Sequence, residues 1–460
     1  MSPAEMKGFK SYLKGLYPQK TVLHHVFDYL HKYHPDYRFE NKLEAGYAHQ
    51  KIFARPLKTK SHRSNLFNTL GEIKNYLEDY LLWGEMQKDT FRRDETLLEI
   101  YRERNIYDFY KKYFDKAWQR LEQNDNLDMW NESRRLRLKH DRYFYRNTDG
   151  FEGRTQTLNE TIRHLNALWI SGTLKYACEL SFITGMQKEK MNYPLLEEAK
   201  SMCLEPPYSG NIFNKIYLLM LRLLEEEDFE AYLELKQLIF NNYQLAEPND
   251  KSLFYGFLLN YVSQKMKRGQ ILLYGEEPLD IYRFGLYSGI VLEDGKISSV
   301  AFNNIITTAC RAKDIAFARE VIEKLAGNLE DKLRADAVKI AEAIIAIEEA
   351  QYDKALEFLN TGEFFSPDLG LRYRIIKSQC LFEIRSFDVL EYHLNAFEHW
   401  IRRNVKKLGL PNQEATLNMI KYTRLLTRPE GNSQKMLEEL EKAPYLFNKA
   451  WLIEKLNDLK

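Results

Sequence analysis

The segment from Leu333 to Leu359, LRADAVKIAEAIIAIEEAQYDKALEFL, constrains the fold more than any other part of the chain. Its pattern predicts two helices joined by a tight turn at residues 349–351. Neither helix can bury its apolar face alone, so this pair needs further helices stacked against it. Small residues stand where two helices would approach closely, and these are Ala341, Ala343, Ala346 and Ala355.

The segments on either side of this pair have the same form. Residues 300–325 place Ala318, and residues 371–394 place Leu390, at the position that Ala355 occupies in the central pair. These positions are 37 and 35 residues apart, close to the period of about 34 in tetratricopeptide repeats. With its small residue, aromatic turn residue Tyr352 and following alanine, the central pair resembles a tetratricopeptide repeat, although Leu390 departs from the alanine pattern and Ala350 stands where glycine is usual. The resemblance implies a right-handed superhelix of antiparallel helix hairpins.

The composition favours helices throughout the chain. Its 460 residues include 21 glycines and 13 prolines, which is few for a fold with many β-turns. This length exceeds one ordinary core. We therefore expect an all-α protein in three parts: an N-terminal helical unit over 1–86, irregular helical hairpins over 87–250, and a tetratricopeptide-like array with a C-terminal capping helix over 251–460. Ser2, Pro3 and Glu5 predict the first helix start, with Ser2 as N-cap of a capping box.

The whole chain also resembles an uncharacterised family of helical-repeat proteins from Bacteroidota. Three stretches carry this resemblance: the opening SPAEMKGFKSYL, the turn and helix LEDGKISSVAFNNIITTA, and the unit QYDKALEFL. The resemblance implies a helical-repeat fold and does not imply a particular activity.

Composition also bears on the compartment, where we expect a cytoplasmic protein. The net charge of +1 favours no class of partner. The first twenty residues lack the apolar core of a secretory signal, and no run approaches the 18 apolar residues of a membrane span. Widely spaced cysteines without a CxxC motif are typical of buried free thiols in a reducing compartment, and these are Cys178, Cys203, Cys310 and Cys380.

The sequence offers little evidence for catalysis or metal binding. It contains no GxSxG, P-loop or GxGxxG motif, so we expect neither an enzyme nor a cofactor. His24, Asp28 and His31 share one helical face at spacings that a metal site could use, opposite Val22 and Val26. No HExxH motif and no further ligand at a diagnostic spacing accompanies them. We therefore predict ordinary surface histidines and no bound metal.

One candidate surface is a basic and aromatic segment that ends at residue 146. Arginine beside stacking aromatic rings is typical of proteins that bind single-stranded nucleic acid or another anionic partner. Residues 1–150 contain 28 Lys and Arg against 22 Asp and Glu, a mild excess. The alternative is a solvated helix face whose cations pair with acidic residues such as those at 225–228. The cations of this basic segment are Arg134, Arg135, Arg137, Lys139, Arg142 and Arg146.

The second candidate surface follows from the tetratricopeptide resemblance, in which the first helix of each pair lines the concave side. Aligning the three hairpins at their close-packing positions predicts an apolar strip between polar ends, suited to an apolar peptide segment with a few fixed hydrogen bonds. An alternative is that the chain's own helices cover the strip. This inner strip consists of Asn303, Thr307, Arg311, Ile340, Ile344, Ile347, Arg372, Ile375, Gln379 and Phe382.

We therefore expect a non-enzymatic scaffold that binds a protein or peptide partner in the inner strip. The alternative is a nucleic-acid-associated or regulatory protein that uses the basic segment. The carboxylate clamp of chaperone-binding tetratricopeptide domains is not expected, because Thr307, Ala341 and Ile376 occupy three of its lysine or asparagine positions.

Overall fold

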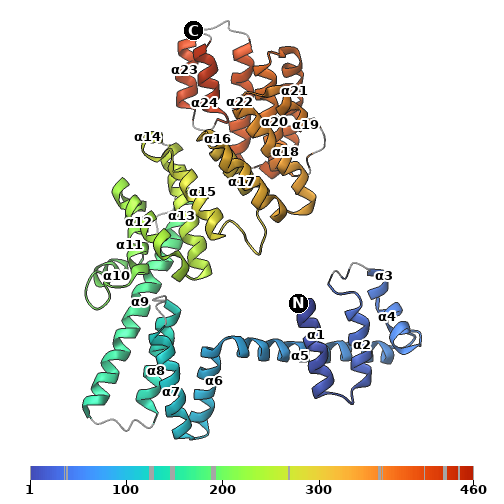
Figure 1. Ribbon diagram of the computed structural model, residues 1–460, viewed down its shortest axis with the longest axis vertical. Coiled ribbons are helices and arrows are strands. Elements are labelled where there is room, and N and C mark those ends of the chain that lie inside the picture. The colour runs from blue at the N-terminus through green and yellow to red at the C-terminus, as the bar shows by residue number, and fades with distance from the viewer. Residues whose placement is uncertain are drawn as a thin grey trace. The chain divides into compact units, whose positions relative to one another are not determined.

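The protein is all-helical in the part of the chain that the computed structural model describes (Figure 1). Described are residues 2–35, 37, 40–123, 129–145, 151–187, 193–267, 270–360, 364, 366–408, 410–427, 433–443 and 446–458. Within them, β-pairing is limited to one isolated bridge between Glu293 and Lys296 in a turn. The all-α class expected from the sequence is thereby confirmed. The chain forms two compact units, Met1–Leu168 and Trp169–Lys460.

The first unit holds the helices of the N-terminal third. Helix α9 continues into the second unit, because the boundary between the units falls within it. The helices are α1 (Pro3–Leu16), α2 (Thr21–His31), α3 (Glu40–Leu43), α4 (Ala45–Phe53), α5 (Lys60–Lys88), α6 (Thr90–Glu103), α7 (Tyr107–Glu122), α8 (Met129–Phe144) and α9 (Phe151–Gln187).

Helix α1 starts as its sequence predicts. The Ser2 hydroxyl accepts a hydrogen bond from the Glu5 N–H at 3.2 Å, and the Glu5 carboxylate accepts one from the Ser2 N–H at 2.7 Å. With Pro3 in the first turn, the predicted capping box is confirmed. Helices α1, α2 and α5 pack around a small core, in which the ring of Phe9 meets that of Phe27 edge-on at a centroid distance of 5.3 Å.

The second unit contains the predicted repeat region and the C-terminal helices. Its elements after α9 are α10 (Leu196–Cys203), α11 (Ile212–Glu225), α12 (Phe229–Asn242), η1 (Tyr243–Leu245), α13 (Pro248–Lys267), α14 (Ile271–Tyr274), α15 (Glu277–Ser288), α16 (Ser299–Arg311), α17 (Ile315–Leu325), η2 (Ala326–Asn328), α18 (Asp331–Glu348), α19 (Tyr352–Leu359), α20 (Pro367–Glu383), α21 (Phe387–Leu408), α22 (Leu410–Thr427), α23 (Ser433–Lys442) and α24 (Lys449–Asp458).

The same turn joins α16 to α17, α18 to α19 and α20 to α21. Its left-handed residue is Lys313, Ala350 or Arg385, with φ of 60°, 56° and 55°. In each turn the next N–H donates to a carbonyl five residues earlier, at 2.9, 2.8 and 3.0 Å. This bond satisfies a carbonyl that the end of the helix would otherwise leave unpaired. The α6–α7 hairpin of the first unit has the same turn at Asn105, with φ of 57°.

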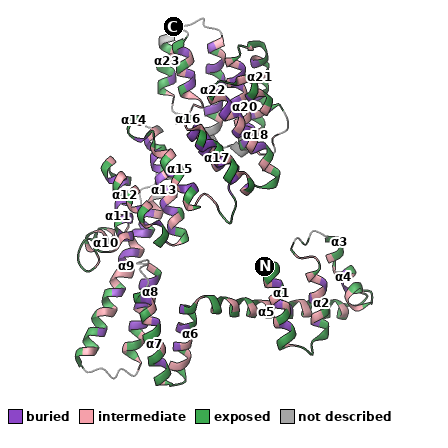
Figure 2. Cartoon of the chain, in the orientation of Figure 1, coloured by how far each residue is buried: buried purple, intermediate pink, exposed green. Residues whose placement is uncertain are grey.

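In each of the three hairpins, the residue five positions after the left-handed residue of the turn lies where two helices meet. Ala318, Ala355 and Leu390 all have 0 % of their surface exposed, and buried residues are purple in Figure 2. Helix α16 packs on α18 and α18 packs on α20, so each hairpin covers the apolar face of its neighbour. The first two hairpins therefore share one core, which α20 joins on one face, while the other face of α20 packs with α21 and the C-terminal helices in a second core.

The two units do not coincide with the three parts expected from the sequence. Their boundary lies inside α9, where an uninterrupted helix gives no change in composition. The expected breaks near residues 86 and 250 instead fall close to helix ends, at Lys88 of α5 and Pro248 of α13. The division of the chain into three parts at these two positions stays a prediction.

Replacing Ala355 by leucine should lower the free energy of unfolding by about 1–3 kcal/mol, because the added atoms overpack a fully buried site. Ala355→Asp should cost more, since it buries a charge without a partner. Thermal or urea unfolding measures both effects. Ala316→Leu, at an exposed position of α17, is the matched control and should change stability by less than about 0.5 kcal/mol. Parent-like melting of both Ala355 variants would contradict the packing.

Replacing Ala350 by glycine should raise the free energy of unfolding by up to about 1 kcal/mol, because its left-handed backbone strains any residue with a Cβ atom. Ala335→Gly, at an exposed position within α18, should instead lower it by about 1 kcal/mol. Chemical denaturation of the two variants compares them directly. Equal destabilisation by both substitutions would show that the turn is not left-handed in solution.

Candidate functional site

The structure places the inner strip on three neighbouring helices. Helix α18 contacts both α16 and α20, and α16 also contacts α20 directly. The first helices of alternate hairpins therefore converge over α18, and they do not line a wide groove along their whole length.

Three residues of the inner strip belong to the core. Asn303 and Ile340 are 0 % exposed, and Ile375 is 8 % exposed. The Asn303 side chain donates a hydrogen bond from Nδ2 to the Ser299 carbonyl at 3.0 Å within its own helix. This corrects the prediction for these three positions, because Asn303 and Ile340 are enclosed where α16, α18 and α20 meet, and Ile375 lies in the core that α20 forms with α21 and the C-terminal helices.

Arg372 is the residue that connects the two converging helices. Its guanidinium donates hydrogen bonds from α20 to Asn304 and Thr307 of α16, the second at 3.5 Å. Tyr282 of α15 lies close enough for the charge of Arg372 to affect its pKa. Burial lowers the pKa of Arg372, and the nearby charge of Arg311 lowers it further. Arg372 therefore holds a positive charge among neutral hydrogen-bond partners.

The other end of the inner strip is covered by the C-terminal helix α24. Gln379 accepts a hydrogen bond from the side chain of Asn448 at 3.1 Å. The ring of Phe382 meets that of Trp451 nearly perpendicularly at a centroid distance of 5.2 Å, and Trp451 donates from Nε1 to Glu383 at 2.6 Å. The alternative that the chain's own helices cover the strip therefore describes this end of it.

The accessible part of the inner strip lies between these covered ends. Arg311 is exposed, while Thr307, Ile344 and Ile347 are half-buried. Burial lowers the pKa of Arg311 even though its side chain reaches solvent, so its guanidinium is crowded by protein atoms and still open to water. The accessible members of the predicted strip thus include one cation, one hydroxyl and two aliphatic side chains.

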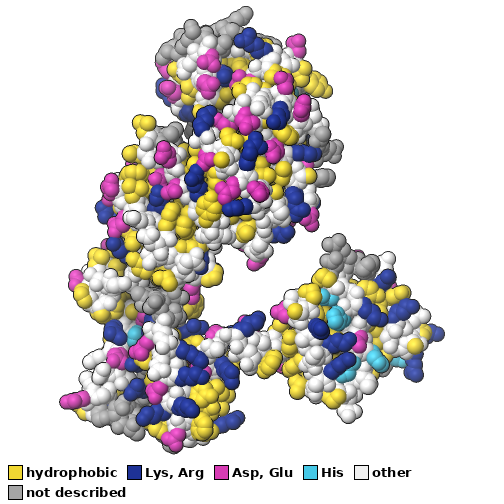
Figure 3. Space-filling view, viewed as in Figure 1, with side chains coloured by type: hydrophobic (Ala, Val, Ile, Leu, Met, Phe, Trp, Pro, Cys, Tyr) yellow, Lys and Arg dark blue, Asp and Glu magenta, His cyan; other side chains and the backbone are white. Residues whose placement is uncertain are grey.

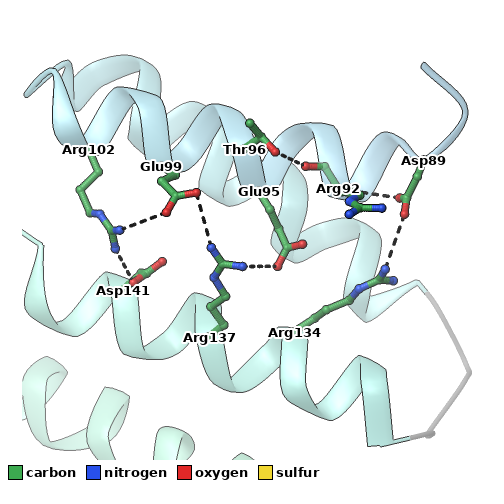
Figure 4. A network of polar contacts seen from close by, with 9 residues as sticks. All are labelled: Asp89, Arg92, Glu95, Thr96, Glu99, Arg102, Arg134, Arg137 and Asp141. Atoms are coloured by element: carbon green, nitrogen blue, oxygen red, sulfur yellow. Dashed lines mark hydrogen bonds and ion pairs between the residues drawn. The ribbon is translucent and has the colours of Figure 1, made fainter. Parts of the chain in front are cut away.

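In the first unit, cations of the basic segment form ion pairs with the acidic side chains around α6. Arg137 lies 3.8 Å from both Glu95 and Glu99, and Arg134 lies 3.6 Å from Asp89. Figure 4 shows these pairs as a ladder between α6 and α8. The acidic partners are thus not those at 225–228 that we expected, which pair within the second unit with Lys200, Arg222 and Lys265.

Of the remaining described cations of the basic segment, Arg135 and Lys139 are buried in the helix bundle and Arg142 is exposed. Arg135 lies 2.7 Å from Glu132, and Lys139 lies 2.5 Å from Glu160 and 3.9 Å from the centre of the Trp118 ring. Both side chains are about 10 % exposed. Arg142 stacks over the Phe114 ring at 5.4 Å, and Arg146 lies outside the described residues. The cations of the basic segment that are described contribute to packing in the first unit.

A buried carboxylate connects three helices of this unit. Glu132 of α8 pairs with Arg135 and accepts a hydrogen bond from Nδ1 of His164 on α9 at 2.8 Å. Burial alone would raise the pKa of Glu132, but the hydrogen bond from His164 and the charges of both partners outweigh it and lower the pKa. Arg135 also donates to the Leu121 carbonyl of α7 at 2.9 Å. The group stabilises the contact between α7, α8 and α9.

The histidines of the N-terminal helices, cyan in Figure 3, have other partners than a metal. His24 donates from Nε2 to the Tyr17 carbonyl at 2.9 Å, and Asp28 pairs with Lys10 at 2.8 Å. In the part of the chain that is described, no three His, Cys, Asp or Glu side chains are grouped as a metal site requires. The expected apolar face needs one correction, because Val22 is 46 % exposed. The absence of a bound metal stays a prediction.

Comparison with known proteins adds no relative to this description. No protein-family model matches the chain, and neither does any curated protein or any solved structure. Among the described helices, none combines the length and the apolar character that crossing a bilayer requires. The fold defines an all-helical protein built from packed hairpins, and both resemblances noted in the sequence stay predictions.

Sequence reasoning missed two features of these surfaces. The first is that α24 is the helix that covers one end of the inner strip, because the sequence indicated possible cover without indicating which helix provides it. The large ring of Trp451 in the predicted capping helix could have indicated it. The other is the pairing of Glu132 with His164, which are 32 residues apart. A spacing of that size carries no helical periodicity, so no local pattern could have indicated the pair.

Glu132 should make the first unit sensitive to acid. Its folded pKa lies below the unfolded value of about 4.3, so its stabilising contribution is complete above that pH and is lost as the pH falls through the folded pKa. Glu132→Gln should destabilise the protein at neutral pH and flatten the loss of stability below about pH 4.3. Denaturant titrations across this range measure the slope, with the exposed Glu152→Gln as control. A parent-like slope in Glu132→Gln would exclude this role.

Proposed function

We propose that this protein is a non-enzymatic scaffold that binds a segment of a protein partner at the accessible part of the inner strip. The observation that carries the proposal is that α16, with the exposed Arg311, packs against α18, with the half-buried Ile344 and Ile347. Such a surface offers apolar area together with a charged donor, which is the combination that peptide-binding sites use to obtain affinity and orientation.

The arrangement of the hairpins supports a tetratricopeptide-like array as the frame of this site. Three hairpins share one turn geometry, place a fully buried residue at the same distance from the turn, and pack first helix against first helix. We propose that they form a right-handed superhelix of tetratricopeptide type, in a protein of the helical-repeat family from Bacteroidota that the sequence resembles. In this array the first helices hold the site and the second helices support them from outside.

The nucleic-acid alternative has less support. Arg134, Arg135, Arg137 and Lys139 of the basic segment pair with carboxylates of their own unit. Phosphate binding would have to compete with these pairs, and for Arg135 and Lys139 it would also expose side chains that are packed in the bundle. The same residues are better explained as contacts between helices.

A cytoplasmic location fits the cysteines. Cys178, Cys203, Cys310 and Cys380 are all free and buried. Burial raises the pKa of each thiol, to about 12 for Cys310 and Cys380, which keeps the thiols protonated and unreactive. Thiols of this kind suit a reducing compartment, and we propose that the scaffold works there.

Site-specific photo-crosslinking in the native host tests the proposed function. A photoreactive phenylalanine analogue at Ile347 should capture one recurring partner segment, whereas the same analogue at Ala316, exposed on α17, should not. Ile344→Glu should reduce that capture by at least about tenfold, because a carboxylate replaces apolar contact area. Val389→Glu, at an exposed position on α21, is the control and should leave capture unchanged.

The folded state of each variant decides what a loss of capture means. Circular dichroism and melting temperature of Ile344→Glu should stay close to those of the parent, since Ile344 is only half-buried. Equal capture from Ile347 and Ala316, or full capture by a folded Ile344→Glu, would show that the inner strip is not the binding surface.

A further inference from the structure

Two arginines of the inner strip differ from the other cations around them. Arg311 and Arg372 make no ion pair with any described carboxylate, and the only hydrogen-bond partners of Arg372 are the neutral side chains of Asn304 and Thr307. Thr307 and Arg311 are one helical turn apart on α16, so both arginines are associated with the same face of that helix. The charge of each guanidinium is therefore compensated by solvent, by neutral hydrogen-bond partners and by a carboxylate beyond ion-pair distance, which is Glu348 for Arg311 and Asp368 for Arg372.

The acidic residues near Arg311 are paired with other cations, while Asp368 acts on Arg372 only from beyond ion-pair distance. Glu348 pairs with Lys313, and Arg319 pairs with Glu349 at 3.2 Å and Glu342 at 3.7 Å. Over this unit, lysine and arginine side chains generally alternate with acidic ones, as the dark blue and magenta atoms of Figure 3 show. The inner strip departs from that pattern, since no described carboxylate lies within ion-pair distance of either guanidinium, although Glu348 and Asp368 act on them from farther away.

The two cations are also close enough to repel each other. The charge of Arg311 lowers the pKa of Arg372, and burial lowers the pKa of both groups. An arginine side chain stays protonated under these conditions, so the cost appears as lost stability and not as a lost proton. A bound anion would remove this cost, because planar guanidinium groups match the oxygens of a carboxylate in two parallel hydrogen bonds.

We propose that Arg311 and Arg372 bind a carboxylate side chain of an otherwise apolar peptide segment. The inference rests on the proposed function and specifies the chemistry of the partner at that site. Ile344 and Ile347 are half-buried on α18, the helix that packs against both α16 and α20, and they provide the apolar contact, so the segment carries an aspartate or glutamate next to aliphatic residues. Unlike the carboxylate clamp of chaperone-binding repeats, this pair is formed by arginines, and Thr307 occupies one of the clamp positions.

One test needs no ligand. Arg311→Gln removes the like-charge interaction with Arg372, so it should raise the melting temperature by about 1–3 °C. Arg319→Gln is the matched control, because Arg319 is half-exposed and already ion-paired. It should not raise the melting temperature. If Arg311→Gln lowers the melting temperature as much as Arg319→Gln does, the charge of Arg311 is already compensated and the proposal is overturned.

The second test measures binding to an array of short peptides that combine glutamate with leucine in varied order, beside a matched array with glutamine for glutamate. The tightest glutamate peptides should bind at least about tenfold more strongly than their glutamine counterparts, as charge-assisted hydrogen bonds predict. Arg311→Gln should remove that difference, and the double variant with Arg372→Gln should too. Arg402→Gln, an exposed cation on α21 that pairs with Glu398, should preserve it.

The outcomes separate the proposal from the function on which it rests. If neither array binds, the proposed peptide-binding function itself fails. If both arrays bind equally and Arg311→Gln changes nothing, the scaffold function stands and the carboxylate site is wrong. Inorganic phosphate alone, tested in parallel, should not reproduce the stabilisation given by the glutamate peptides, and full stabilisation by phosphate would show a small-anion site instead.

Discussion

The fold depends on close contact between the two helices of each hairpin. This contact requires a residue without exposed surface five positions after a left-handed turn, and Ala318, Ala355 and Leu390 fill that position. The turn fixes where the second helix begins, and the buried residue fixes how near it lies to the first. Because each helix has an apolar face larger than one partner can cover, the hairpins stabilise one another by stacking.

Stacking also limits the surface that remains for a partner. Once α16 reaches α20, Ile340 beneath them is enclosed and Arg372 connects the two helices above it. The C-terminal helix α24 then occupies the other end through Asn448 and Trp451. A sequence pattern that predicts ten inward-facing positions thus corresponds to a smaller accessible surface, because α16, α18 and α20 contact one another and α24 covers Gln379 and Phe382.

Charge is used differently in the two units. In the first unit, cations of the basic segment are neutralised by carboxylates of neighbouring helices, and Glu132 with His164 brings such a pair into the interior. A paired charge stabilises a helix contact and offers little to a ligand. In the second unit, Arg311 and Arg372 form no ion pair with a described carboxylate, and Glu348 and Asp368 act on them only from farther away. The difference between a structural and a binding cation therefore lies in its neighbours and not in its residue type.

The sequence by itself determined the helical class, the capping box at Ser2, and the positions of the buried residues in the three hairpins, because these follow from spacings within one or two helices. It also brought Arg311 and Arg372 into one predicted strip. Only the tertiary structure decided which residues of that strip reach solvent, which cations are paired, and that α24 covers Phe382. Those outcomes depend on contacts between residues far apart in the chain, such as Glu132 with His164, and periodicity within a helix carries no information about them.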